Sequence, residues 1–130
     1  MFVRLFLALS ALVWVPYGLF CFFRPEYLSE AAGVASASPT GTLELRAMYG
    51  GLQAAFGVLA GLAVFRPPLR RPALVTLAFA TGGLFIARLG GIGIGTEMSG
   101  YTAGALAFEL VSTAIAIWLL RSDPELALPT

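Results

Sequence analysis

The sequence lacks most of the residues that common enzyme chemistry needs. Its 130 residues include no histidine and a single cysteine, Cys21. Histidine is the commonest metal ligand and the side chain that titrates near neutral pH, so its absence argues against the usual zinc sites and serine triads. A lone cysteine forms neither an internal disulfide nor a CxxC redox pair. We therefore expect no catalytic residue, no metal and no cofactor of these kinds.

Charge is scarce as well. Charged residues make up 12% of the chain, against about 25% in soluble domains. The eight basic and seven acidic residues nearly cancel, with a formal net charge of +1, so nucleic acid is not an expected partner. The chain is instead 58% hydrophobic, and we expect membrane lipids to surround it.

Hydrophobic residues gather in four runs, each long enough for a helix that crosses a bilayer, which takes ~20 residues. The first run is longer than the apolar part of a secretion signal and has no cleavage site after it, so we expect it to be retained. Short connections make neighbouring helices antiparallel. The sequence predicts one domain, residues 1–130, that is all-α: an integral membrane four-helix bundle. The predicted spans are residues 5–23, 45–65, 73–94 and 101–120.

The first connection, residues 24–43, is the longest. It opens with RPEYLSEAAG, in which Pro25 is a plausible helix start and Gly33 a plausible stop. Leu28, Ala31 and Ala32 would then share one side of a short helix, which we expect to rest at the membrane surface. The remaining VASASPTGT is typical of a loop.

Arginines between the spans lie mostly on one side of the predicted bundle. By the positive-inside rule this side faces the cytoplasm, which predicts a multi-pass protein of the cell (inner) membrane with both termini cytoplasmic. Arg4, Arg66, Arg70, Arg71 and Arg121 fall on this side, and Arg24 falls on the other.

Ionisable residues interrupt the apolar runs, and two of them lie at a similar depth. Arg88 is six residues before the outer end of its span, or ~9 Å. Glu109 is eight residues after the outer start of the next span, or ~12 Å. These two opposite charges are therefore expected at a similar depth on antiparallel neighbouring helices.

Other polar residues enter from the same outer side. In a regular α-helix, Tyr49 and Gln53 follow Arg46 at i+3 and i+7, on one face. Tyr17 is six residues, ~9 Å, from the outer end of its span. We predict one polar cluster in the outer half of the bundle, consisting of Tyr17, Glu44, Arg46, Tyr49, Gln53, Arg88 and Glu109.

The formal charges of this cluster cancel, and pairing is expected because an unpaired charge at membrane depth costs about 2.5–3.5 kcal/mol on insertion scales. Arginine forks bind carboxylates well, so the charges should face inward and contact each other. Two interpretations stay open: an ion-pair cluster that locks helix register, or a pocket that holds a ligand headgroup or relays protons. Glu44 and Arg46 have a third option, which is to reach the outer interface.

Glycines supply a second pattern. GVLAG and GYTAG match the GxxxG spacing, which lets membrane helices approach closely. We expect packing within the monomer rather than dimerisation. The predicted packing glycines are Gly50, Gly51, Gly57, Gly61, Gly100 and Gly104.

Three stretches carry a resemblance to a known family: ELRAMYGGLQAAFG, ARLGGIGIG and FELVSTAIAIW. The chain resembles the bacterial family called domain of unknown function 4345, within the wider DoxX-like group of small four-helix membrane proteins. The resemblance covers nearly the whole chain, and E-x-R-x-x-Y-G-G is its most specific part. Relatives in the wider group include respiratory-chain accessory subunits and assembly helpers, which favours a partner role by analogy. The resemblance places the family's pattern on Glu44, Arg46, Tyr49, Gly50, Gly51, Arg88 and Glu109.

We therefore expect a small membrane protein without evident catalytic machinery, which binds a lipid-like or quinone-like ligand or serves as an accessory subunit of a larger membrane protein complex. One alternative is an isomerase-like membrane enzyme with Glu44 or Glu109 as acid or base beside Arg88. Another is a proton or solute path formed by a homo-oligomer. An elongated pocket that reaches the polar cluster would favour a ligand or catalysis, and a tightly packed interior would favour a subunit role.

Overall fold

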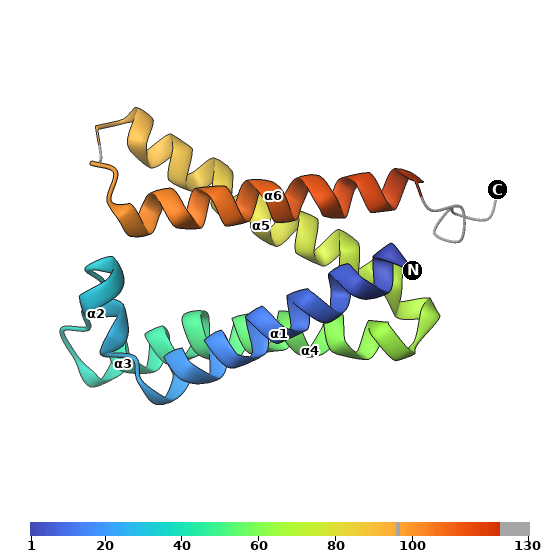
Figure 1. Ribbon diagram of the computed structural model, residues 1–130. Coiled ribbons are helices and arrows are strands. Elements are labelled where there is room, and N and C mark those ends of the chain that lie inside the picture. The colour runs from blue at the N-terminus through green and yellow to red at the C-terminus, as the bar shows by residue number, and fades with distance from the viewer. Residues whose placement is uncertain (96, 123–130) are drawn as a thin grey trace.

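The computed structural model describes residues 1–95 and 97–122, and over these residues the chain is helical and contains no strand (Figure 1). The predicted all-α fold class is confirmed. The elements are α1 (Phe2–Phe23), α2 (Tyr27–Ala32), α3 (Pro39–Leu45), the π-helical segment η1 (Arg46–Gly51), α4 (Leu52–Phe65), the 3₁₀ turn η2 (Pro67–Leu69), α5 (Arg70–Gly93) and α6 (Gly100–Ser122).

Four of the helical stretches are long and apolar enough to cross a membrane. They are Phe2–Phe23, Pro39–Phe65, Pro67–Gly93 and Gly100–Ser122. Each predicted span overlaps one of them, and the third predicted span ends one residue beyond Gly93. Every long helix also exposes large apolar side chains, as lipid contact requires. Leu12, Val58, Phe79 and Val111, one from each long helix, are all more than half exposed.

The connection between α1 and α4 is more helical than the sequence pattern predicted. The predicted short helix is present as α2, which ends at Gly33 in the left-handed conformation, with φ 68°. The following segment was predicted as loop, but α3 begins within it at Pro39. Ser38 caps α3, because its side chain accepts a hydrogen bond from the Gly41 N–H at 3.1 Å. A capping serine before a proline at the first helical position is a favourable helix start.

The long helices form two antiparallel pairs (Figure 1). One pair consists of α1 and α4, and the other of α5 and α6. The two pairs meet at the end of the molecule that holds the start of α1, and they part toward the opposite end, where α2 and α3 lie. We call these the closed end and the open end. The bundle is therefore a wedge and not a uniformly packed cylinder.

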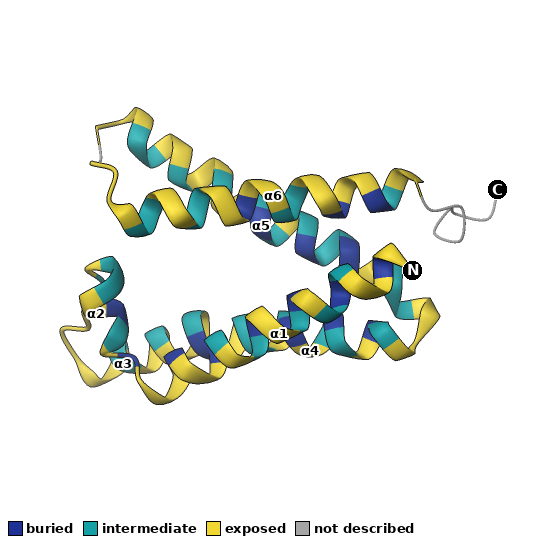
Figure 2. Ribbon diagram, viewed as in Figure 1, coloured by how far each residue is buried: buried dark blue, intermediate teal, exposed yellow. Residues whose placement is uncertain are grey.

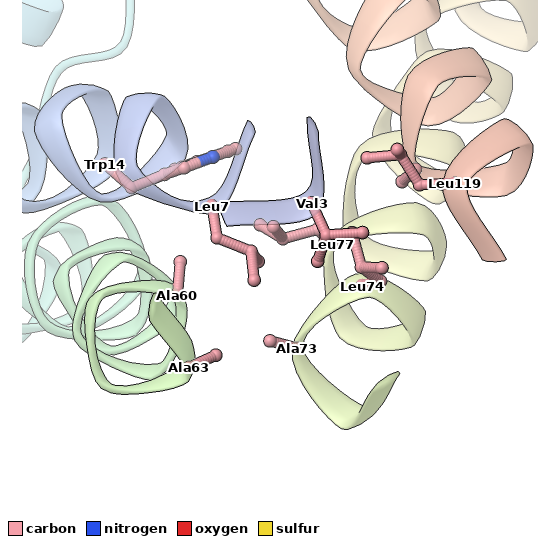
Figure 3. Packing of buried hydrophobic residues seen from close by; sticks show 10 residues of the cluster. Val3, Leu7, Trp14, Ala60, Ala63, Ala73, Leu74, Leu77 and Leu119 are labelled. Atoms are coloured by element: carbon pink, nitrogen blue, oxygen red, sulfur yellow. The ribbon is translucent and has the colours of Figure 1, made fainter. Parts of the chain in front are cut away.

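The closed end holds the hydrophobic core, and Figure 2 shows the buried positions concentrated there. Small alanines on α4 and α5 let larger side chains fill the space between the pairs. In Figure 3, Val3 and Leu7 of α1 point toward Leu74 and Leu77 of α5. Leu7 and Leu74 are fully buried. This packing anchors the two pairs to each other.

Glycines bring α1 and α4 into backbone contact. A Cβ added at Gly18 would lie 2.5 Å from the backbone nitrogen of Ala54 and 2.7 Å from the Gly50 carbonyl oxygen. A Cβ at Gly57 would lie 2.6 Å from the Val15 backbone nitrogen. No side chain larger than hydrogen fits these positions without moving a helix, so this pair forms a closely packed wall.

Candidate functional site

A partly open cavity of about 910 Å³ lies between the two helix pairs. This volume is within the usual range for small-molecule sites, about 300–1,000 Å³. Its walls are mostly apolar and come from α1, η1, α4, α5 and α6. The polar side chains that line it are Tyr17, Tyr49, Gln53, Arg88, Tyr101 and Glu109.

Three aromatic rings form the inner boundary of the cavity. Trp14 is only 6% exposed and also belongs to the hydrophobic core. Its ring lies edge-to-face against Phe56 at 5.9 Å and against Phe108 at 5.8 Å, measured between centroids. Such pairs prefer this geometry because the positive ring edge meets the negative face. The rings separate the packed closed end from the cavity.

Arg88 and Glu109 form an ion pair in the cavity wall. The Arg88 Nε–H donates to Glu109 Oε1 at 2.9 Å, which links α5 to α6. Glu109 is 3% exposed, whereas the Arg88 side chain is 28% exposed. The pairing offsets much of the cost of keeping each charge away from water.

Part of the hydrogen-bonding capacity of this pair is unused. Oε2 of Glu109 is buried and has no hydrogen-bond partner within residues 1–95 and 97–122. A guanidinium carries five N–H donors, and in the same residues only Nε of Arg88 has a hydrogen-bond partner. The ion pair in the cavity wall therefore keeps one buried carboxylate oxygen of Glu109, and the terminal guanidinium nitrogens of Arg88, without a hydrogen-bond partner in these residues.

Two tyrosines join the helix pairs across the cavity. The hydroxyl oxygens of Tyr17 on α1 and Tyr101 on α6 are 3.2 Å apart, with either one able to donate. Tyr49 and Gln53 line the wall opposite the ion pair. These groups add neutral donors and acceptors to the site.

The structure brings five of the seven predicted cluster residues to this cavity and leaves two outside it. Glu44 and Arg46 are exposed and do not line it, and neither forms an ion pair within the described part of the chain. Arg46 instead lines a smaller hollow at the open end, with Glu26 and Ser36. The prediction that Glu44 and Arg46 face inward and contact the other two charges is therefore wrong.

The π-helical segment explains this difference. The Leu52 N–H bonds to the carbonyl of Ala47, five residues back, where an α-helix would bond four back. Each residue of such a turn advances by a smaller angle, so Arg46 is rotated away from the face that carries Tyr49 and Gln53. The i+3 and i+7 spacing would have aligned them only in an unbroken α-helix. Adjacent glycines at 50 and 51 are the local weakness that hinted at this break.

The predicted packing glycines also divide. Gly50 and Gly57 contact α1, because an added Cβ would lie 2.7 Å from Phe22 and 2.6 Å from Val15. Gly61 has ordinary spacing to its neighbours, and Gly51 has only a backbone oxygen at 3.9 Å. A Cβ at Gly100 or Gly104 would meet nothing within 4 Å, and both positions line the cavity. These last two widen the site and do not clamp helices together, which corrects the packing prediction for them.

Part of the site was not predicted from the sequence. The sequence pattern did not single out Tyr101, Phe56 or Phe108 as site residues. A signal existed, because Tyr101, Ala105 and Glu109 recur at four-residue steps on one face of α6. Gly18 was missed because a single glycine carries no spacing pattern.

The residues present are poor metal ligands. Within the described residues, no group of three or more His, Cys, Asp or Glu side chains comes together. The site offers one carboxylate, one guanidinium and neutral groups, a set suited to hydrogen-bonding an organic molecule.

The fold and cavity define a class: a four-helix bundle, long and apolar enough to cross a membrane, with a polar site between its helix pairs. The chain matches the family described as Domain of unknown function (DUF4345) over residues 2–120, and it belongs to that family. No curated protein and no solved structure matches it.

Proposed function

We propose that this protein binds a lipid-like amphiphile in the cavity between its helix pairs. The apolar chain of the ligand would lie along the cavity walls, and its headgroup would meet Arg88 and Glu109. One observation carries the proposal: a largely apolar cavity reaches a buried ion pair that has unused hydrogen-bonding atoms. Binding sites of small molecules combine these same features, apolar walls with a few convergent polar groups.

The unused atoms favour a ligand over a purely structural ion pair. A pair that only fixes helix register is expected to have both carboxylate oxygens bonded in a packed interior. Leaving a buried acceptor without a partner costs about 1–3 kcal/mol, and more when the group is charged. A ligand hydroxyl or amide at Oε2 of Glu109 would remove this cost.

A membrane enzyme is the second candidate, because the same free Oε2 of Glu109 could take or give a proton inside the cavity. Conversion of a bound amphiphile would distinguish this reading from binding alone. A proton or solute path through the monomer is less favoured, since Val3, Leu7 and Leu74 fill the closed end with apolar side chains.

The arginine distribution supports an orientation, which is also a proposal. If both termini lie on the cytoplasmic side of the inner membrane, the closed end faces the cytoplasm and the cavity opens toward the outer leaflet. On a Cys21→Ala background, an impermeant thiol reagent should label cysteine introduced at Ser36 from outside and should not label one introduced at Leu69. The opposite pattern would reverse the orientation. Membership of the DoxX-like group and a role as accessory subunit have only the sequence resemblance as support.

Entry of an amphiphile can be tested with Trp14 as a reporter. A Trp118→Phe variant keeps Trp14 as the sole tryptophan, shielded from the surrounding lipid at the inner end of the cavity. Monooleoylglycerol brominated on its chain should quench Trp14 with a saturable dependence on concentration.

The matched control is Trp14→Phe, which leaves Trp118, a residue that is 54% exposed. Its quenching should rise without saturation, because bulk lipid reaches it. If Trp14 is not quenched, or is quenched in the same unsaturable way as Trp118, the cavity does not hold the amphiphile and the proposal fails.

A further inference from the structure

The charge of the cavity restricts the headgroup that it can accept. Among the described residues that line it, Arg88 and Glu109 are the only members with a full formal charge at neutral pH. Nε of Arg88 and Oε1 of Glu109 are 2.9 Å apart, so each charge is already compensated. A net charge on the ligand would therefore be buried without an opposite partner, which is costly in a medium of low dielectric constant.

The unused atoms define the hydrogen-bonding pattern of the headgroup. Oε2 of Glu109 is an acceptor that is buried and unpartnered within the described residues, so it calls for an O–H or N–H group. The side chain of Arg88 is 28% exposed, and its terminal nitrogens call for an oxygen acceptor. The donor and the acceptor of the headgroup must therefore be adjacent, because the two side chains that bind them form one ion pair.

The rest of the site adds only neutral groups. Tyr17 and Tyr101 are already within hydrogen-bonding distance of each other at 3.2 Å, and each hydroxyl both donates and accepts. The amide of Gln53 also does both. These groups suit hydroxyls and carbonyls and supply no charge that would compensate a phosphate or an ammonium.

We infer that the cavity selects an uncharged amphiphile whose headgroup carries a hydroxyl or N–H donor beside a carbonyl or hydroxyl acceptor. Monoacylglycerols and long-chain alcohols are members of this class, whereas anionic phospholipids and fatty-acid anions are not. Zwitterionic headgroups are also disfavoured, because inserting an ammonium and a phosphate would desolvate two full charges beside a pair that is already neutral. The inference rests on the proposed function and names the ligand class of the same site.

A competition experiment tests this inference with the Trp118→Phe protein. Four non-brominated probes with closely matched monounsaturated chains would be compared for how well they displace brominated monooleoylglycerol and restore the fluorescence of Trp14. They are monooleoylglycerol, methyl oleate, oleyl sulfate and oleyltrimethylammonium. Methyl oleate keeps the acceptor and lacks the donor, and the last two carry permanent charges of opposite sign. Monooleoylglycerol should compete at least about tenfold better than each of the others, since a hydrogen bond to a charged group is worth that much.

Two charge variants sharpen the test. Glu109→Gln leaves Arg88 without its counter-charge, so oleyl sulfate should gain about tenfold relative to monooleoylglycerol. Arg88→Gln leaves Glu109 uncompensated, so oleyltrimethylammonium should gain instead. If a variant does not fold, the ranking of probes on the Trp118→Phe protein decides the matter alone.

The outcomes separate the two proposals. No saturable quenching by the brominated probe overturns ligand binding itself. Saturable quenching with equal competition by all four probes leaves ligand binding in place and overturns the headgroup inference. Tighter competition by oleyl sulfate or by oleyltrimethylammonium overturns it as well. A phosphatidylethanolamine of matched chain that competes better than monooleoylglycerol would show that the site takes a zwitterion and would also contradict the inference.

Discussion

The two helix pairs of this bundle are held together in different ways. In the first pair, α1 and α4 touch backbone to backbone at Gly18 and Gly57, and no side-chain hydrogen bond joins them within the described residues. In the second pair, polar side chains join α5 to α6: Thr81 to Thr113 at 2.7 Å and Arg88 to Glu109 at 2.9 Å.

Because of this difference, the two helix pairs contribute to the cavity in different ways. Glycine contacts give a stiff wall that presents aromatic and amide side chains, because any separation of the helices loses many van der Waals contacts at once. Polar contacts place charge and hydrogen-bonding groups where a ligand can reach them. The first pair therefore shapes the cavity, and the second pair supplies its chemistry.

The largest loss of stability is expected when the ion pair between α5 and α6 is broken. Arg88→Leu leaves the buried carboxylate of Glu109 without its partner, and such a change costs about 3–5 kcal/mol in soluble proteins. The loss in a membrane is expected to be smaller, since the membrane-unfolded chain also finds partners. The double variant Arg88→Leu with Glu109→Leu should recover much of the thermal stability in detergent. If it is no more stable than the weaker single variant, the two residues do not stabilise the fold as a pair.

An intermediate loss of stability is expected where α1 and α4 touch through glycines. Gly18→Ala places a Cβ 2.5 Å from the Ala54 backbone nitrogen, so α1 and α4 must move apart. Overpacking of this kind costs about 1–3 kcal/mol. The matched control is Gly90→Ala, because a Cβ there meets nothing within 4 Å, and alanine favours a helix by about 0.5–1 kcal/mol over glycine. Equal melting temperatures for the two variants would mean that the first pair is not held by close backbone contact.

The smallest expected effect concerns the second polar contact. The Thr81 hydroxyl donates to the Leu77 carbonyl at 2.8 Å, so Thr113 donates to Thr81. Thr81→Val keeps the side-chain shape and removes this contact, and hydrogen bonds between membrane helices average about 0.6 kcal/mol. A double-mutant cycle with Thr113→Val measures the coupling. A loss of stability as large as that of Arg88→Leu would mean that Thr81, and not the ion pair, makes the principal polar contact between α5 and α6.

Much of the second pair could be predicted from the sequence. Arg88 and Glu109 stand alone in apolar runs, and regular α-helices carry them to a similar depth, so counting residues was enough to bring them together. The four spans were equally clear, because bilayer thickness fixes the length of an apolar helix.

The first pair was harder to predict. Counting along a regular helix placed Arg46 with Tyr49 and Gln53, and the π-helical turn at residues 46–51 broke that alignment. Whether a GxxxG glycine clamps a helix or borders a cavity depends on what lies opposite it, which spacing does not report. Gly57 faces α1, whereas Gly104 faces open space. The wedge shape of the bundle was not predicted, because it depends on where the two pairs separate.

Native mass spectrometry of the protein, extracted from its own membrane in mild detergent, tests most directly whether the cavity holds an amphiphile. The wild-type protein should retain one bound molecule with the mass of an uncharged amphiphile. Gly104→Phe fills the cavity and should lose that molecule, whereas Gly90→Phe, on an exposed surface outside the cavity, should keep it. A wild-type protein that carries no bound molecule, or a Gly104→Phe variant that carries the same one, would contradict the account.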